Sequence, residues 1–185
     1  TTEYTFETEL KNLSHEPGKA AVAYIDEMYW ISATDYQVLR ISWIYERDNT
    51  MRIQFQSEKK GKDILLKNLP IPITPTSVLS AVKLKLARSG SKISGYADIG
   101  TGYQLLDTFT IYDVRPQQGT LALWADSPTK ASVTVKSIQF TCGENTKPAA
   151  LYKFNEGTST VVSNSIDTVY AGTFSGTGIH WTSGK

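Results

Sequence analysis

The amino-acid sequence predicts an almost entirely β domain, built as an antiparallel sandwich of two sheets. Across residues 3–142 the apolar side chains recur at every second position, which is the period of a strand with one face on a core. The apolar runs are short, and they are separated by Gly, Pro, Asn and Asp, the residues that form turns. No stretch holds the 3.6-residue period of an amphipathic helix.

The runs that fit this pattern are expected to be strands: Tyr4–Leu10, Ala20–Ile25, Tyr29–Ala33, Tyr36–Tyr45, Thr50–Ser57, Asp63–Asn68, Leu79–Ser89, Lys92–Ile99, Gln104–Thr110, Gly119–Asp126 and Ser132–Cys142. The segments between several of them carry turn residues: Arg47-Asp48-Asn49, Lys60-Gly61-Lys62, Ser89-Gly90-Ser91 and Gly100-Thr101-Gly102. Because Gly and Asn tolerate a positive φ, these segments predict tight hairpins. Asp26-Glu27 is expected to form a further short turn.

The segment Asn68–Ser77 contains Pro70, Pro72 and Pro75. A proline has no backbone N–H to donate to a neighbouring strand, so this segment is expected at a sheet edge or in a loop that crosses between sheets. A jelly roll needs such a crossing. We therefore predict an all-β, two-sheet antiparallel jelly-roll sandwich.

Length and charge narrow the function classes. The 185 residues suffice for one sandwich and the beginning of another, but not for two complete ones. The formal net charge of +1 gives no basic surface for nucleic acid or an anionic membrane. No apolar run is long enough to span a bilayer, and no signal segment opens the sequence, so we expect the export signal of the parent protein to lie upstream.

Cysteine and histidine chemistry is not indicated. The single Cys142 ends an apolar run and is interpreted as a half-buried structural residue. The only histidines, His15 and His180, are far apart in the sequence and lack the spacing of zinc ligands or a cysteine to activate. No metal site is predicted from these residues.

The order of the strands resembles that of the concanavalin A-like lectin/glucanase sandwiches. The resemblance covers the opening strand Phe6–Leu10, the small-residue strand Ala20–Tyr24, the hairpin formed by Tyr36–Tyr45 and Thr50–Phe55, and the late run Gly119–Ala125. It implies two curved antiparallel sheets and sugar binding on a concave face or at the loops. Several members carry a structural calcium ion, but this chain has Lys136-Ser137 where the family usually places an acidic residue, so no cofactor is predicted.

The C-terminal residues resemble the first strands of a laminin-G-like module. The resemblance rests on Ala150–Gly157, Gly172-Thr173-Phe174 and Ile179-His180-Trp181. It implies a sandwich at residues 1–143, a linker at 144–149 and the incomplete start of a second module at 150–185. We therefore expect the chain to be a piece of a longer multi-modular protein.

Alternation assigns side chains to the two faces of each strand. The expected core residues are Leu39, Ile41, Trp43, Tyr45, Met51, Ile53, Phe55, Val82, Leu84, Leu86, Leu121 and Leu123. The opposite, polar face is expected to carry Arg40, Ser42, Arg52, Gln54, Gln56, Lys83, Lys85, Tyr96, Asp98, Trp124 and Asp126.

A polar face with aromatic rings fits sugar recognition. A ring stacks on the C–H side of a sugar, while amide, guanidinium and carboxylate groups bond to its hydroxyls. The candidate sugar-binding residues are Trp124, Asp126, Arg40, Arg52, Gln54, Tyr96 and Tyr36. The alternative is a merely solvated face, which we prefer for Lys83 and Lys85. The arginines need an acidic neighbour, either Asp126 or Asp98 of the chain or an acidic sugar such as a uronate.

A second group of aromatic residues lies around Asp26-Glu27 and Ala33-Thr34-Asp35. Loop aromatics are another common place for a sugar. Such close residues are more often a corner of the core, and the spacing of Trp30 and Met28 suits burial. Only Tyr29 or Tyr36 is expected to be accessible.

The sequence favours a non-catalytic carbohydrate-binding module of a secreted polysaccharide-processing protein. Its predicted partners are polysaccharides and further modules of the same chain. A glycoside hydrolase of this fold would need two carboxylates together on one strand face, for which only Glu7 with Glu9 has suitable parity, because Asp26 and Glu27 point two ways. A polysaccharide lyase would need a histidine in the central strands, where none occurs. A structural or adhesive module is the other alternative, and it should bury Trp124, Tyr96 and Tyr36.

Overall fold

The computed structural model describes residues 3–32, 34–60, 62–70, 79–111, 118–126, 130–143, 149–153, 161–162, 165–166 and 172–173. These residues form strands, turns and loops and contain no helix. No helix among them is therefore long and apolar enough to cross a membrane. The all-β prediction is confirmed.

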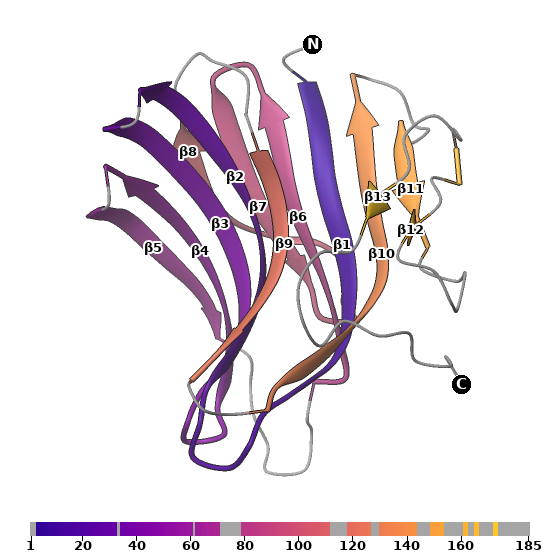
Figure 1. The fold of residues 1–185 in the computed structure, drawn as a ribbon. Coiled ribbons are helices and arrows are strands. Elements are labelled where there is room, and N and C mark those ends of the chain that lie inside the picture. The colour runs from indigo at the N-terminus through magenta and orange to yellow at the C-terminus, as the bar shows by residue number, and fades with distance from the viewer. Residues whose placement is uncertain are drawn as a thin grey trace.

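Two antiparallel sheets stack face to face (Figure 1). Sheet A has the order β11-β10-β1-β6-β7-β8, with β1 at Glu3–Ser14, β6 at Ala81–Ser89, β7 at Lys92–Asp98, β8 at Gln104–Thr110, β10 at Ser132–Cys142 and β11 at Ala150–Tyr152. Sheet B has the order β5-β4-β3-β2-β9, with β2 at Ala21–Ser32, β3 at Asp35–Tyr45, β4 at Met51–Lys59, β5 at Lys62–Pro70 and β9 at Gln118–Ala125. A separate pair joins β12 (Val161–Val162) to β13 (Gly172–Thr173).

The chain passes repeatedly from one sheet to the other, as the predicted jelly roll requires. It leaves sheet A between β1 and β2, returns between β5 and β6, and changes sheets again between β8 and β9 and between β9 and β10. Pro70 ends β5, which is an edge strand of sheet B. The other two prolines of the predicted crossing, Pro72 and Pro75, lie outside the described residues.

The predicted turn at Asp26-Glu27 is wrong, because both residues lie inside the continuous strand β2. Asp26 faces outward and pairs with Arg40 of β3, its direct neighbour in the register. Glu27 faces inward and is buried. Two adjacent acids suggested a turn, but each has a partner on its own side of the sheet, so the strand continues through them.

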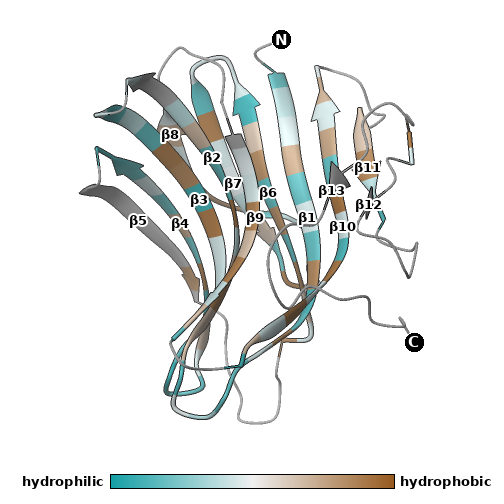
Figure 2. Cartoon of the chain, viewed as in Figure 1, coloured by the Kyte–Doolittle hydropathy of each residue, from teal (hydrophilic) through white to brown (hydrophobic). Residues whose placement is uncertain are grey.

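Apolar residues alternate with polar ones along the strands (Figure 2), and the inner set forms the core between the sheets. The predicted core residues are buried or packed against the core, and Trp43, Phe55 and Leu39 are among those with no exposure. Leu123 departs from the prediction and is 38% exposed. Its strand, β9, is an edge strand of sheet B, so one flank has no neighbouring strand to cover it.

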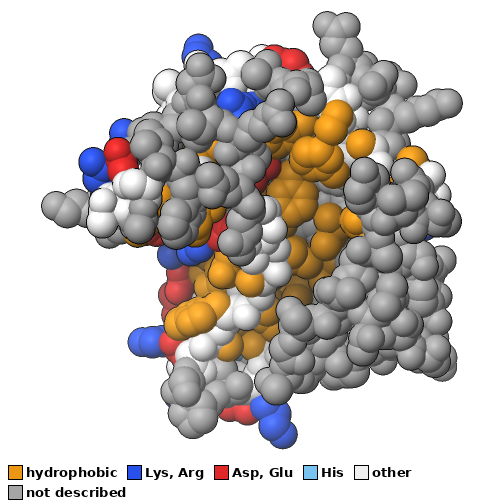
Figure 3. All heavy atoms as spheres, turned by 45° about the horizontal axis from the view of Figure 1, so that its top comes forward, with side chains coloured by type: hydrophobic (Ala, Val, Ile, Leu, Met, Phe, Trp, Pro, Cys, Tyr) orange, Lys and Arg blue, Asp and Glu red, His pale blue; other side chains and the backbone are white. Residues whose placement is uncertain are grey.

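The two sheets are offset sideways, which leaves part of the inner surface open. A Cβ built on Gly119 of β9 would lie 3.5 Å from the Phe6 ring, so the edge of sheet B packs over β1. Strands β10 and β11 lie beyond β1, and Val133 and Val135 of β10 are only partly buried. Figure 3 shows hydrophobic side chains that remain visible in a hollow across the middle of the molecule.

The first residues of the predicted second module take part in the sandwich. Ala150, Leu151 and Tyr152 form β11, which pairs with β10 at the edge of sheet A. The division into a sandwich, a linker at 144–149 and a second module at 150–185 stays a prediction, since most of 144–185, including His180, lies outside the described residues.

The two sheets approach each other closely at Gly95 of β7. A Cβ placed on Gly95 would meet the Phe55 ring of β4 at 2.6 Å, which is shorter than any ordinary contact. Glycine is therefore required here for space, since its φ is not among the positive ones. The Phe55 ring fills this gap and also contacts Phe109 at a centroid distance of 4.7 Å.

One polar group lies deep between the sheets. The Glu27 carboxylate accepts hydrogen bonds from the hydroxyls of Tyr29 (2.6 Å) and Tyr4 (2.8 Å). The two hydroxyls are themselves 2.8 Å apart. Burial raises the pKa of Glu27, while the two tyrosine hydroxyls and then the Arg88 charge oppose that rise. The group joins β1 to β2 across the core.

Gly95→Ala should destabilise the domain by about 1–3 kcal/mol, because the added methyl group overpacks the Phe55 ring. Urea denaturation checks this. Gly119→Ala is the matched control, since its Cβ would have an ordinary 3.5 Å contact with Phe6. Equal stabilities for the two variants would contradict the close approach.

Glu27→Gln should change the pH dependence of stability. Because the pKa of Glu27 is raised in the folded state, protonation is favoured there, and its contribution is full below the unfolded pKa of about 4.3. That contribution is lost as the pH rises from this value to the folded pKa. The stability of the wild type relative to Glu27→Gln should therefore fall as the pH rises, in denaturation measured from pH 4 to 8. A difference that is constant or grows with pH would overturn this assignment.

Candidate functional site

The outer face of sheet B carries a row of aligned side chains from four strands. Trp124 of β9 lies beside Val22 of β2, and Val22 lies beside Ile44 of β3. Ile44 in turn lies beside Arg52 of β4. With neighbouring strands about 4.8 Å apart, the row is about 14 Å wide. It begins with an aromatic ring, continues with two aliphatic side chains and ends with a charge.

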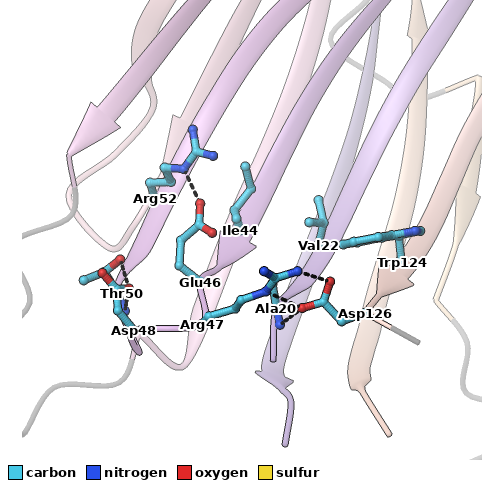
Figure 4. A pocket seen from close by; sticks show the side chains of 10 residues that line it. All are labelled: Ala20, Val22, Ile44, Glu46, Arg47, Asp48, Thr50, Arg52, Trp124 and Asp126. Atoms are coloured by element: carbon cyan, nitrogen blue, oxygen red, sulfur yellow. Dashed lines mark hydrogen bonds and ion pairs between the residues drawn. The ribbon is translucent and has the colours of Figure 1, made fainter. Parts of the chain in front are cut away.

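This row forms the floor of a shallow hollow of about 740 Å³ at one end of sheet B (Figure 4). The lining residues are Ala20, Val22, Ile44, Glu46, Arg47, Asp48, Thr50, Arg52, Trp124 and Asp126. We call this hollow the Trp124 pocket. Its floor is apolar, and its charged residues come mainly from the β3–β4 turn and from the residue that follows β9.

Trp124 is 52% exposed, which is unusual for so large an apolar side chain. It belongs to an edge strand, and its neighbour Val22 covers only one flank. Figure 4 shows the indole extending toward Val22. The exposed ring is therefore available for stacking on a ligand.

Arg47 and Asp126 close one side of the Trp124 pocket. The Arg47 guanidinium forms a bidentate ion pair with Asp126. It donates from Nε to Oδ2 at 2.7 Å and from Nη2 to Oδ1 at 2.9 Å. The Ala20 N–H also donates to Asp126 Oδ2 at 2.9 Å. The hydrogen bonds from Arg47 and then from the Ala20 backbone lower the pKa of Asp126 to about 2. Asp126 is thus ionised and held in place at any physiological pH.

The other side of the pocket has a second ion pair and an ordered turn. Arg52 Nε donates to Glu46 Oε1 at 2.7 Å. Asp48 accepts from the N–H (3.0 Å) and the hydroxyl (2.6 Å) of Thr50, and these bonds lower the pKa of Asp48. The predicted turn at Arg47-Asp48-Asn49 is confirmed, with Asn49 at a φ of 65°.

Three predicted site residues, Trp124, Asp126 and Arg52, line the pocket. Gln54 and Arg40 lie on the same face but outside it. Gln54 is buried, and Arg40 donates twice to Asp26 (3.1 and 2.8 Å) while it stacks over the Tyr24 ring at 4.2 Å.

Tyr36 pairs with Trp30 at the far end of the same face, about 27 Å from the Trp124 row, counted as eight residues along β2. It is partly exposed, whereas Tyr29 is completely buried, so Tyr36 is the accessible one of the two. The side chain of Trp30 lies outside the described part of the structure.

Tyr96 does not belong to this face. Together with Lys83, Lys85 and Asp98 it lies in sheet A, and the expectation of a single polar face is wrong for these residues. Lys85 Nζ lies over the rings of Tyr96 (4.7 Å) and Tyr103 (3.9 Å). Alternation assigns a side chain to the inside or the outside, but it does not say which of two outer faces an outward residue occupies.

Val22, Ile44, Glu46 and Arg47 were not predicted as site residues. Val22 and Ile44 stand within apolar runs, Ala20–Ile25 and Ile41–Tyr45, and neither was assigned to the core or to the polar face. Each is next in sequence to an inward-facing residue, Ala23 or Trp43, so strict alternation would have placed both side chains on the outer face. Arg47 was predicted only as a turn residue, and Glu46 was assigned no role.

The acidic pairs considered for catalysis are separated from this pocket. Glu7 and Glu9 lie on the outer face of sheet A, where Glu7 accepts from the Tyr103 hydroxyl at 3.1 Å and Glu9 pairs with Lys11 at 3.3 Å. Asp26 and Glu27 face opposite sides of sheet B, as expected. Among the described residues, no three His, Cys, Asp or Glu side chains are grouped so that they could hold a metal ion.

Comparison with known proteins gives a likeness of fold. No protein-family model and no curated protein matches the sequence. The chain is similar in structure to GH43B of the Bacteroides ovatus xyloglucan PUL, with a TM-score of 0.53 and 13% identity over 77% of this chain and 28% of that one. It thus spans less than a third of that protein.

Two further similar structures are of more comparable length. One is a functionally unknown protein from Saccharomyces cerevisiae, with a TM-score of 0.52, 10% identity and coverage of 78% of this chain and 71% of that one. The other is the CBM2 module of the evolved Dit of Lactobacillus casei BL23 phage J-1, with a TM-score of 0.51, 10% identity and coverage of 75% and 61%. These likenesses confirm a β-sandwich fold, and the finer concanavalin-like and laminin-G-like assignments stay predictions.

Arg47→Gln should raise the pKa of Asp126 from about 2 toward the ordinary 3.9, because the largest cause of the lowering is removed. The value should stay below 3.9, since the Ala20 N–H still donates to the carboxylate. A ¹³C NMR titration of the Asp126 carboxyl carbon in both proteins measures this. An unchanged pKa would show that the Arg47–Asp126 pair does not form in solution.

Proposed function

We propose that this domain is a non-catalytic carbohydrate-binding module of a secreted, multi-modular polysaccharide-processing protein, and that it binds sugar in the Trp124 pocket. The observation that carries the proposal is the exposed Trp124 ring, which continues into the apolar side chains of Val22 and Ile44 between charged borders. A sugar ring offers a C–H face to such a floor and hydroxyl groups to such borders.

The positions of the charged groups support this assignment. Asp126 and Glu46 present carboxylate oxygens that accept hydrogen bonds, and they are held by Arg47 and Arg52. Groups already held in place lose little conformational freedom when a ligand binds. A structural or adhesive module would be expected to bury Trp124, whereas here more than half of it is exposed.

Several observations support a binding role over a catalytic one. Glu7 and Glu9 have the parity of a glycosidase pair, but they lie on the other sheet and are engaged by Tyr103 and Lys11. In the Trp124 pocket, the carboxylates of Glu46 and Asp126 are each paired with an arginine, and the lowered pKa of Asp126 keeps that group ionised. A glycosidase needs one carboxyl group that is protonated and can act as an acid.

The sandwich fold shared with GH43B and with a CBM2 module agrees with the proposal at the level of fold. Affinity should be modest, because the pocket is shallow and each hydrogen bond to a sugar adds only about 1 kcal/mol over its bond to water. Dissociation constants in the micromolar to millimolar range are expected.

Trp124→Ala should weaken binding to the retained polysaccharide by about tenfold or more, since it removes the stacking surface. Affinity electrophoresis against plant, algal and fructan polysaccharides measures this loss. Leu105→Ala is the matched control, because Leu105 is an equally exposed apolar residue (56%) on sheet A.

Circular dichroism should show that both variants keep the β fold. Retention that survives Trp124→Ala would move the site away from this pocket. The absence of retention on every polymer would overturn the proposal.

A further inference from the structure

The charges of the Trp124 pocket also bear on which class of sugar enters it, an inference that rests on the proposed function. The pocket is lined by three carboxylates, Glu46, Asp48 and Asp126, and by two guanidinium groups, Arg47 and Arg52. Its formal charge is therefore −1. A pocket for an acidic sugar would be expected to carry an excess of positive charge.

The two arginines are also engaged by acids of the chain itself. Arg47 uses two of its N–H groups on both oxygens of Asp126, which is the geometry that a uronate carboxylate would otherwise require. Arg52 donates its Nε–H to Glu46. An acidic sugar would therefore have to share each arginine with Asp126 or Glu46, which places a second negative charge beside that carboxylate.

A further arginine on the same face, outside the pocket, is arranged in the same way. Arg40 donates from Nε and Nη2 to the buried carboxylate of Asp26, and its guanidinium lies over the Tyr24 ring. Each arginine on this face that the structure describes thus has an acid of the chain as a partner. The acid that the neighbouring arginines need comes from the protein.

We propose that the Trp124 pocket binds uncharged polysaccharides and discriminates against uronate-containing or sulfated ones. Its floor offers the exposed Trp124 ring and the partly buried Val22 side chain to the C–H side of a sugar, and the buried Ile44 lies beside Val22. Its carboxylate oxygens accept hydrogen bonds from hydroxyl groups. Both interactions favour a neutral sugar, and the net negative charge repels an anionic one.

The test compares one polymer in neutral and charged form. A neutral polysaccharide retained in affinity electrophoresis is oxidised so that its primary hydroxyl groups become carboxylates, and both forms are titrated by calorimetry. The oxidised form should bind about tenfold or more weakly at low ionic strength. The difference should shrink in 0.5 M salt, because charges near the surface are then screened.

Asp126→Asn is the informative variant. It removes one negative charge and releases Arg47, so the penalty on the oxidised polymer should fall severalfold relative to the neutral one. Glu9→Gln on sheet A is its matched control, since it makes the same change in net charge away from the pocket. An equal change in both variants would assign the discrimination to overall charge and overturn the role of the pocket.

The outcomes separate this inference from the proposed function. Tighter binding of the oxidised polymer that Trp124→Ala abolishes would keep the sugar site and overturn its neutrality. Retention of acidic polymers alone, such as polygalacturonate but not its methyl ester, would do the same. If neither the neutral nor the oxidised polymer bound, both this inference and the proposed function would be overturned.

Discussion

The packing of sheet B against sheet A constrains everything on its outer face. Phe55 of β4 fills the space above Gly95 of β7, where no side chain would fit. Sheet B therefore cannot slide along its strands without losing this contact. A shift of one residue would turn every inward side chain of a strand outward. The tight inner surface thus holds the register that aligns Trp124, Val22, Ile44 and Arg52 in one row.

Neighbouring residues of β2 show how the same strand serves both sides. Asp26 faces outward to Arg40, and Glu27 faces inward to Tyr4 and Tyr29. The inward acid has a raised pKa because burial disfavours its charge. At Asp126, near the surface, an arginine and a backbone N–H lower the pKa instead. The surroundings of Glu27 and Asp126, and not the residue type, thus decide the direction in which each pKa moves.

The sequence allowed the fold class and most strands to be predicted. A strand with one buried face has apolar residues at every second position, and this alternation can be recognised from the sequence alone. Gln104–Thr110 and Ser132–Cys142 have the predicted bounds. Asp26-Glu27 was misjudged, since two adjacent acids favour a turn locally and only their long-range partners, Arg40 and Tyr4, explain a strand. Tertiary contacts outweighed local preference there.

For the candidate site, the sequence was informative about the chemical groups and weak about their grouping. Trp124, Arg52 and Asp126 were predicted and do lie together. Tyr96 was placed with them because parity alone does not distinguish the outer face of sheet A from that of sheet B. Val22 and Ile44 were missed because apolar residues on an outer face look like core in a local pattern. Strand order, which depends on crossings far apart in the chain, was the missing information.

The same strand order explains why this end of sheet B has the pocket. Strand β9 is at the edge of the sheet and brings Trp124 beside β2, while the turn between β3 and β4 brings Glu46, Arg47 and Asp48 to the same end. Arg47 spans from that turn to Asp126, across the end of β2, and so connects the two borders of the hollow. Exposed ion pairs contribute little to stability. The Arg47–Asp126 pair therefore contributes more to the shape and charge of the pocket than to the stability of the fold.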